Sequence, residues 1–74
     1  MPDIDIGTAR GDVKWFSESK GYGFLRLEDG REVFFHFSKI AQDRKVLADG
    51  EPVTCGLRKG DKGIYAYDIR TVNP

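Results

Sequence analysis

Aromatic and basic side chains are crowded into one short stretch of this 74-residue chain. Seven of its nine aromatic residues lie between Trp15 and Phe37, and Lys14, Lys20 and Lys39 stand beside them. Aromatic rings stack on other flat π systems, and lysine ammonium groups attract anions such as phosphate. This combination predicts a surface that holds flat, unsaturated groups carried on an anionic backbone.

The chain offers little for catalysis or for metal binding. Cys55 is the single cysteine, so no internal disulfide forms, and together with the only histidine, His36, it makes no set of zinc ligands. No nucleophile or orienting carboxylate accompanies His36 at a readable spacing, so we do not expect a general base. We therefore expect no enzymatic activity, no cofactor and no metal, and we interpret Cys55 as a small buried residue.

Charge and hydropathy exclude further classes of protein. Twelve basic and twelve acidic residues cancel, so bulk charge cannot attract a polyanion, although a local basic patch still can. No apolar run approaches the roughly 18 residues of a membrane helix. Residues 1–9 lack the basic start and apolar centre of a secretory signal. We expect a cytoplasmic protein with no membrane partner.

Short runs rich in Val, Ile, Phe and Tyr must position these side chains. Residues 1–9 carry two acids, a proline and a glycine, and predict a flexible acidic N-terminal tail. After them, apolar runs separated by glycine clusters predict an all-β barrel or sandwich, with strands over residues 12–16, 22–27, 32–36, 52–57 and 64–72. The pair Asp29-Gly30 predicts a type I′ hairpin turn between the second and third strands. Residues 37–40 predict one helical turn.

The predicted hairpin has two unlike faces, because side chains alternate along a strand. One face carries Leu25, Leu27, Val33 and Phe35, and the other carries Tyr22, Phe24, Phe34 and His36. A small barrel fills its interior with one set of side chains, and no sequence remains for a layer over the other set. Several rings should therefore lie exposed side by side, which monomeric proteins seldom show without a partner.

Exposed rings bordered by cations suit a single nucleic-acid strand, whose unpaired bases offer π faces while its phosphates seek positive charge. A duplex is a poor match, because its bases are already stacked and the chain has no basic helix for a groove. No helix follows Gly21 and Gly23, so they do not form a glycine-rich nucleotide-binding loop. We interpret them as positions where the strand backbone can approach a ligand closely. A barrel that receives a Pro-rich peptide on its rings is the alternative from another class.

Three segments carry a resemblance to a known family: KWF at residues 14–16, KGYGFL at residues 20–25 and VFFHF at residues 33–37. In this order they resemble the bacterial cold-shock domain, whose two ribonucleoprotein motifs correspond to the second and third segments. The resemblance covers nearly the whole chain after the tail. It implies a five-stranded antiparallel barrel of the oligonucleotide-binding (OB) type, with residues 10–74 as the cold-shock domain.

The resemblance also implies a binding site, residue by residue. It places base stacking on Trp15, Tyr22, Phe24, Phe34, His36 and Phe37, with Phe16 at the periphery and contacts to phosphates or base edges at Lys14 and Lys20. Independently of the resemblance, Lys39 and Lys62 flank the aromatic residues in sequence and predict a basic border. Strict alternation separates Lys14 from Trp15, so exposure of both requires a bulge or a bend in the strand. The chain departs from the family in having no aromatic residue between residues 41 and 47 and in carrying Lys62 and Ile64 where Arg and Pro are common.

The implied function is binding of single-stranded RNA and single-stranded DNA without an enzymatic step. The resemblance points to an RNA chaperone that traps unpaired strands, and to regulation of transcription or translation in a cold-shock or stress response. T/U-rich strands should be favoured, because pyrimidines give up less stacking on themselves when they bind. Stacking does not sense the 2′-hydroxyl, so the residues do not distinguish RNA from DNA. We expect a monomer that self-associates weakly through its rings.

Overall fold

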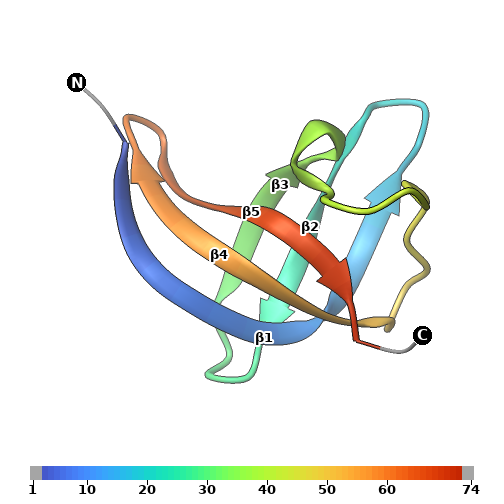
Figure 1. Ribbon diagram of the computed structural model, residues 1–74, viewed down its shortest axis with the longest axis horizontal. Coiled ribbons are helices and arrows are strands. Elements are labelled where there is room, and N and C mark those ends of the chain that lie inside the picture. The colour runs from blue at the N-terminus through green and yellow to red at the C-terminus, as the bar shows by residue number, and fades with distance from the viewer. Residues whose placement is uncertain (1–2, 73–74) are drawn as a thin grey trace.

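The computed structural model describes residues 3–72. Within them the strands close into a barrel in the order β1-β2-β3-β5-β4 (Figure 1). The elements are β1 Ile4–Ser17, β2 Tyr22–Leu27, β3 Glu32–His36, the short 3₁₀ helix η1 Phe37–Lys39, β4 Pro52–Gly60 and β5 Gly63–Thr71. The predicted all-β, five-stranded barrel is confirmed. Its closing contact is parallel, between Phe34 of β3 and Tyr65 of β5, whereas the other neighbouring strands are antiparallel.

Strand β1 takes part in both halves of the barrel and bends around it (Figure 1). Its first part pairs with β4, and its last part, from Gly11 onward, pairs with β2. At Gly11 a Cβ atom would collide with the carbonyl oxygen of Arg26, so the two backbones approach closely only because this residue is glycine. The predicted flexible tail is wrong for residues 4–9, which form a strand against β4; residues 1–2 lie outside the described part of the chain.

The β2–β3 hairpin has the predicted strand bounds but a different turn. A type I′ turn needs positive φ at both central residues, and here only Gly30, with φ 93°, has it. The Gly30 N–H donates to the Leu27 carbonyl at 2.9 Å, and the Leu27 N–H donates to the Arg31 carbonyl at 2.8 Å. The Asp29 carboxylate accepts from the Arg31 N–H at 3.0 Å, which stabilises the longer loop.

One apolar core fills the barrel. Its buried members are Val13, Leu25, Leu27, Val33, Phe35, Ile40, Leu47, Val53, Cys55, Leu57, Ala66 and Ile69. The core-facing set predicted for the hairpin is therefore confirmed, and so is the burial of Cys55. Among residues 3–72 the structure has no helix with the length and apolar character that crossing a membrane requires.

Strand β5 does not alternate regularly between its two faces. Ala66 and Ile69 both point into the core although they are three residues apart. Asp68 lies between them with φ 51°, and the pairing with β4 shifts between Thr54 and Gly56. The irregularity turns Ile69 inward and leaves Tyr65 on the outside of the barrel, opposite to its neighbour Ala66. The predicted helical turn after β3 is confirmed as η1.

Candidate nucleic-acid interface

The outward face of the β2–β3 hairpin carries three cross-strand pairs. Their Cα partners are Tyr22 with His36, Phe24 with Phe34, and Arg26 with Glu32. Opposed side chains on one face of an antiparallel pair have Cβ atoms about 4.5 to 5.5 Å apart and interact directly. The alternation read from the sequence therefore places two predicted stacking residues from each strand in one compact group.

Trp15 joins this group from β1 through an irregularity in the strand. The pairing of β1 with β2 shifts between Val13 and Trp15, so Val13 is buried while Lys14 is exposed and Trp15 is half-buried beside Phe24. The bulge that the sequence requires for exposure of both Lys14 and Trp15 is confirmed. A β-bulge re-aims side chains next to functional sites in this way.

Four rings form a continuous patch, which we call the ring surface: Trp15, Tyr22, Phe24 and Phe34. The Trp15 ring centre lies 5.7 Å from that of Tyr22 and 5.5 Å from that of Phe24. Phe34 lies 5.6 Å from Tyr22 and 5.9 Å from Phe24, with interplanar angles of 43° and 76°. These tilted and edge contacts hold the rings side by side without stacking them face to face.

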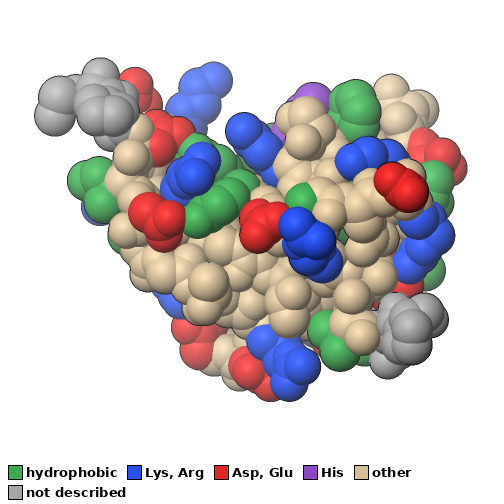
Figure 2. Space-filling model, in the orientation of Figure 1, with side chains coloured by type: hydrophobic (Ala, Val, Ile, Leu, Met, Phe, Trp, Pro, Cys, Tyr) green, Lys and Arg blue, Asp and Glu red, His purple; other side chains and the backbone are tan. Residues whose placement is uncertain are grey.

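The ring surface is open to solvent. Phe34 is 38% exposed, and the other three rings are half-buried. These four rings are therefore not core residues, because side chains from the opposite face of the sheet fill the core. Figure 2 shows hydrophobic side chains near the N-terminal end of the chain, with basic and acidic side chains interspersed around them.

His36 and Phe37 lie at the junction of β3 and η1. The Phe37 ring is 46% exposed and its centre lies 4.9 Å from that of His36. The backbone N–H of Ser38 donates to His36 Nδ1 at 3.2 Å, so in the neutral imidazole the proton resides on Nε2. His36 is exposed, and Nε2–H is then the group that can donate to a base edge or a phosphate.

Phe16 lies apart from the ring surface. Its ring stacks on the core residue Phe35 with centres 5.7 Å apart and an interplanar angle of 17°, and it packs against the core cluster. After the bulge, consecutive residues again point to opposite sides, so Trp15 faces outward and Phe16 faces the end of the core. Phe16 is also half-buried and lines a pocket together with Phe37, so its place at the periphery of the binding site stays a prediction beside its packing role.

The two glycines of the GYG segment serve the fold. At Gly23 a Cβ atom would collide with the Trp15 carbonyl oxygen and lie 3.0 Å from the Phe35 ring. Gly21 has φ 77°, a conformation that favours glycine, and its carbonyl accepts from the Phe37 N–H at 2.9 Å. At Gly23 the protein itself makes a close approach on the side where a Cβ atom would lie, and the approach of this backbone to a ligand stays a prediction.

Lys14 lies in an ion pair at the border of the ring surface. Its Nζ is 2.8 Å from Glu32 Oε1, and the Arg26 guanidinium lies 3.6 Å from Oε2 of the same carboxylate. The hydrogen bond from Lys14 is the largest cause that holds the pKa of Glu32 below its ordinary value, so Glu32 is ionised at neutral pH. An exposed ion pair of this kind is weak, and a phosphate can replace Glu32 as the partner of Lys14.

Three further lysines border the site. Lys20 is exposed in the turn between β1 and β2, where its N–H donates to Ser17 Oγ at 3.3 Å. Lys39 ends η1, and its Nζ lies 5.9 Å from the centre of the Tyr65 ring. Lys62 is exposed in the turn between β4 and β5. The three lysines come from separate connections, and Lys62 lines a pocket together with Phe34 of the ring surface.

Sequence reasoning missed Arg26 as a site residue. It follows Tyr22 and Phe24 at the same alternation and is exposed on the same face. That spacing was a sufficient signal. The pairing of Arg26 with Glu32 lies across the hairpin, so the sequence does not show that an acid also belongs to this border.

The single cysteine, Cys55, is buried. Burial raises the pKa of the Cys55 thiol to about 11, so it stays protonated and unreactive at neutral pH. No cluster of His, Cys, Asp and Glu suited to a metal ion occurs among residues 3–72. Binding through rings and cations is the chemistry that this surface supports.

Comparison with known proteins identifies relatives along most of the chain. The family described as the 'Cold-shock' DNA-binding domain matches residues 9–72. Cold shock protein 2 of Lactiplantibacillus plantarum is 46% identical over 61 residues, which cover 81% of this chain and 92% of that protein. Cold shock-like protein CspE of Escherichia coli is 47% identical over 62 residues, which cover 81% and 90%. Cold shock protein CspB of Bacillus caldolyticus is 41% identical over 61 residues, which cover 81% and 92%.

Proposed function

The chain belongs to the bacterial cold-shock protein family of non-enzymatic nucleic-acid binders, and from this premise we propose that it binds single-stranded RNA and single-stranded DNA by stacking unpaired bases on its ring surface. The observation that carries the proposal is the solvent-open group of Trp15, Tyr22, Phe24 and Phe34. His36 and Phe37 extend the stacking area, and Lys14, Lys20, Lys39 and Lys62 hold the phosphates. Arg26 adds a cation to the Lys14 border.

Stacking supplies most of the binding free energy in this proposal. Each stacked base contributes about 1 to 3 kcal/mol, so four or five rings give micromolar or tighter affinity after the cost of ordering the strand. Any base stacks, so sequence preference is modest and favours T/U-rich strands. With about three phosphate contacts, log affinity falls against log salt concentration with a slope of about −2.

The same energetics support an RNA chaperone that works without ATP. A duplex step is worth about 1.4 kcal/mol on average, which is comparable to one stacked base. Trapping open strands therefore melts short or mismatched hairpins and leaves long helices intact. We place this activity in the cytoplasm, where the free thiol of Cys55 stays reduced, and in the control of transcription or translation under cold shock or other stress.

Titration of Trp15 fluorescence tests the proposal. Oligo-thymidine should quench the emission because the indole belongs to the ring surface, and a Pro-rich peptide should not. Quenching by the peptide alone would favour the protein-interaction alternative. A fluorophore-labelled RNA hairpin with a short stem tests the chaperone activity, since the protein should open it in the absence of nucleotide triphosphate while a long-stemmed control stays closed.

A further inference from the structure

Tyr65 continues the ring surface across the closing contact of the barrel. It is the parallel Cα partner of Phe34, and it points outward because its neighbour Ala66 is fully buried. The ring is half-buried, and Lys39 Nζ lies 5.9 Å from its centre. An aromatic side chain beside a cation is the same pairing that characterises the proposed binding face.

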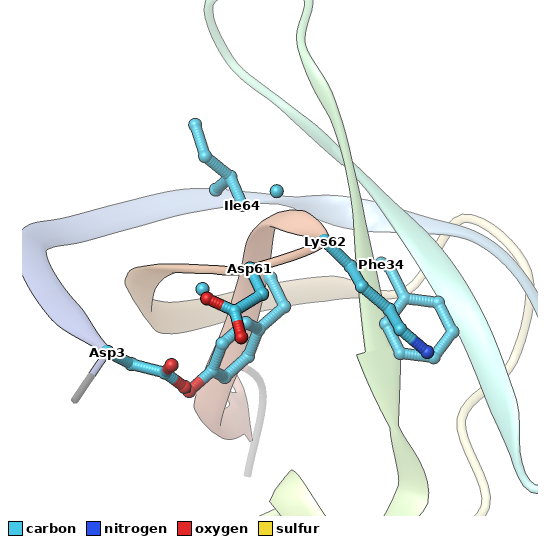
Figure 3. Close-up of a pocket in the computed structure, with 8 residues that line it drawn as sticks. Asp3, Phe34, Asp61, Lys62 and Ile64 are labelled. Carbon is cyan, nitrogen blue, oxygen red and sulfur yellow. The ribbon is translucent and has the colours of Figure 1, made fainter. Parts of the chain in front are cut away.

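A cavity opens between Phe34 and Tyr65. Its volume is about 460 Å³, and Ile64 and glycine backbone complete its apolar walls. This volume falls in the range of about 300 to 1,000 Å³ that small-molecule sites occupy. Figure 3 shows Asp3 and Phe34 on opposite sides of this cavity, with Asp61 and Lys62 of the β4–β5 turn between them.

The N-terminal part of β1 holds the tyrosine ring in position. The Tyr65 hydroxyl donates to the Asp3 carboxylate, and this bond is the largest cause that raises the pKa of Tyr65. Asp3 is placed there because Ile4 pairs with Lys59 of β4. Residues 3–8 precede the part of the chain that matches the family, so this contact is an addition to the barrel.

Charges around the cavity suit a base inside it and phosphates at its edge, where Arg58, the cross-strand Cα partner of Tyr65, adds a cation. Asp3 and Asp61 at the rim are acceptors only, and they repel phosphate while accepting from base N–H groups. Lys62 at the rim and Lys39 over Tyr65 attract the phosphates that flank such a base. The arrangement therefore points the base inward and the backbone toward the lysines.

We propose that this cavity is an additional base-binding position, in which Tyr65 is a stacking platform for one further nucleotide of the strand bound on the ring surface. The inference rests on the proposed function, because Phe34 belongs to both sites. Asp3 acts as a positioning residue through the Tyr65 hydroxyl. The occupant is a single nucleobase at one end of the bound strand.

Three variants of Tyr65 test the platform with oligo-thymidine of increasing length. Tyr65→Ala should weaken binding of the longer oligomers roughly 5- to 150-fold, the range that one stacked base accounts for. It should also reduce the number of nucleotides occluded per protein on poly(dT) by about one. Tyr65→Phe keeps the ring but loses the hydroxyl that Asp3 holds, so it should bind more weakly than the unmodified protein and more tightly than Tyr65→Ala. Tyr65→Leu keeps apolar bulk without a π system and should behave like Tyr65→Ala.

Tyr67→Ala is the matched control. Tyr67 lies on the same strand and donates to Asp5 at 2.6 Å, but its ring packs under the Arg58 guanidinium, 3.8 Å from the ring centre, and over Gly56. Its loss should leave the occluded length unchanged. Unaltered affinity and occluded length in Tyr65→Ala and Tyr65→Leu, with the unmodified protein still binding, would overturn the additional position and leave the ring surface intact. Failure of the unmodified protein to bind oligo-thymidine would instead overturn the proposed function.

Discussion

The two faces of the β2–β3 hairpin share one backbone, but one face is buried and the other is exposed to solvent. Leu25 and Phe35 on the inner face are fully buried, whereas Phe34 on the outer face is 38% exposed. Both faces carry large aromatic rings, so the presence of an aromatic residue alone does not show which face is buried. Closure of the barrel determines which face is buried, because the interior admits one set of side chains and no second layer covers the other. Apolar residues of the inner face therefore stabilise the fold, and those of the outer face remain free to bind.

Truncating the inner face should have the largest effect. Phe35→Ala leaves a cavity under Phe16 and should cost about 3 to 5 kcal/mol of unfolding free energy. That is as much as the core of so small a domain supplies, about 3 to 5 kcal/mol. Urea denaturation followed by circular dichroism should therefore show a largely unfolded variant. A Phe35→Ala protein that lost less than about 1 kcal/mol would contradict the assignment of this face to the core.

Truncating the outer face should separate binding from folding. Phe34→Ala removes a ring that contacts Tyr22 and Phe24, and should weaken oligo-thymidine binding by about 1 to 3 kcal/mol. The melting temperature should stay close to that of the unmodified protein. Ile6→Ala is the control, because Ile6 is 43% exposed but lies on β1 away from the rings; its affinity should not change. If Phe34→Ala unfolded the protein while each folded molecule still bound with unchanged affinity, Phe34 would be a residue that stabilises the core and does not bind the ligand.

Removing the negative charge of Glu32, beside Lys14, should raise the affinity for oligo-thymidine, by less than the loss expected for Phe34→Ala. Glu32→Gln releases Lys14 and Arg26 and deletes a negative charge near the bound phosphates. Affinity for oligo-thymidine at low salt should rise about threefold, as expected for one unit charge several ångströms away in water. The gain should vanish at high salt because of screening. Glu28→Gln, an exposed acid beyond the end of β2, serves as the control, and an equal gain in both variants would refute a specific role of the Lys14 pair.

The thiol of Cys55 should affect stability only at alkaline pH. Burial raises its pKa to about 11 in the folded protein, so above its ordinary value the unfolded chain loses the proton first. Stability should fall as the pH rises from about 9 to about 11. The decrease should be smaller in Cys55→Ala, measured by urea denaturation at pH 8 and pH 10. Rapid reaction of the native thiol with a disulfide reagent at pH 8 would contradict its burial.

Local patterns predicted the face that matters most. Alternation separated Phe34 from Phe35, and the Asp29-Gly30 pair located the hairpin with the correct strand bounds. The exposure of Trp15 beside Lys14 followed from the family resemblance and required the bulge that the structure contains. These features depend on residues close in sequence or on motifs carried by single strands.

Local sequence patterns could not predict contacts between residues that are far apart in the chain. Residues 4–9 show no sustained periodicity in isolation, but they pair with β4, and Asp5 accepts from the hydroxyl of Tyr67, 62 positions away. The packing of Phe16 on Phe35 depends on the bulge in β1, after which consecutive side chains again point to opposite sides of the strand. The turn at Gly30 differs from the predicted type because Asp29 does not adopt the positive φ that a type I′ turn requires.

A titration with six-residue oligo-thymidine, followed by two-dimensional ¹H–¹⁵N NMR spectra, tests most directly whether bases settle on the outer face of the hairpin. The predicted result is that the Trp15 indole and the backbone amides of residues 14–15, 20–24 and 34–37 shift progressively and saturate, while amides of the first part of β1 and of its β4 partners stay in place. Shifts confined to those β1 and β4 amides, with the Trp15 indole unmoved, would contradict the account.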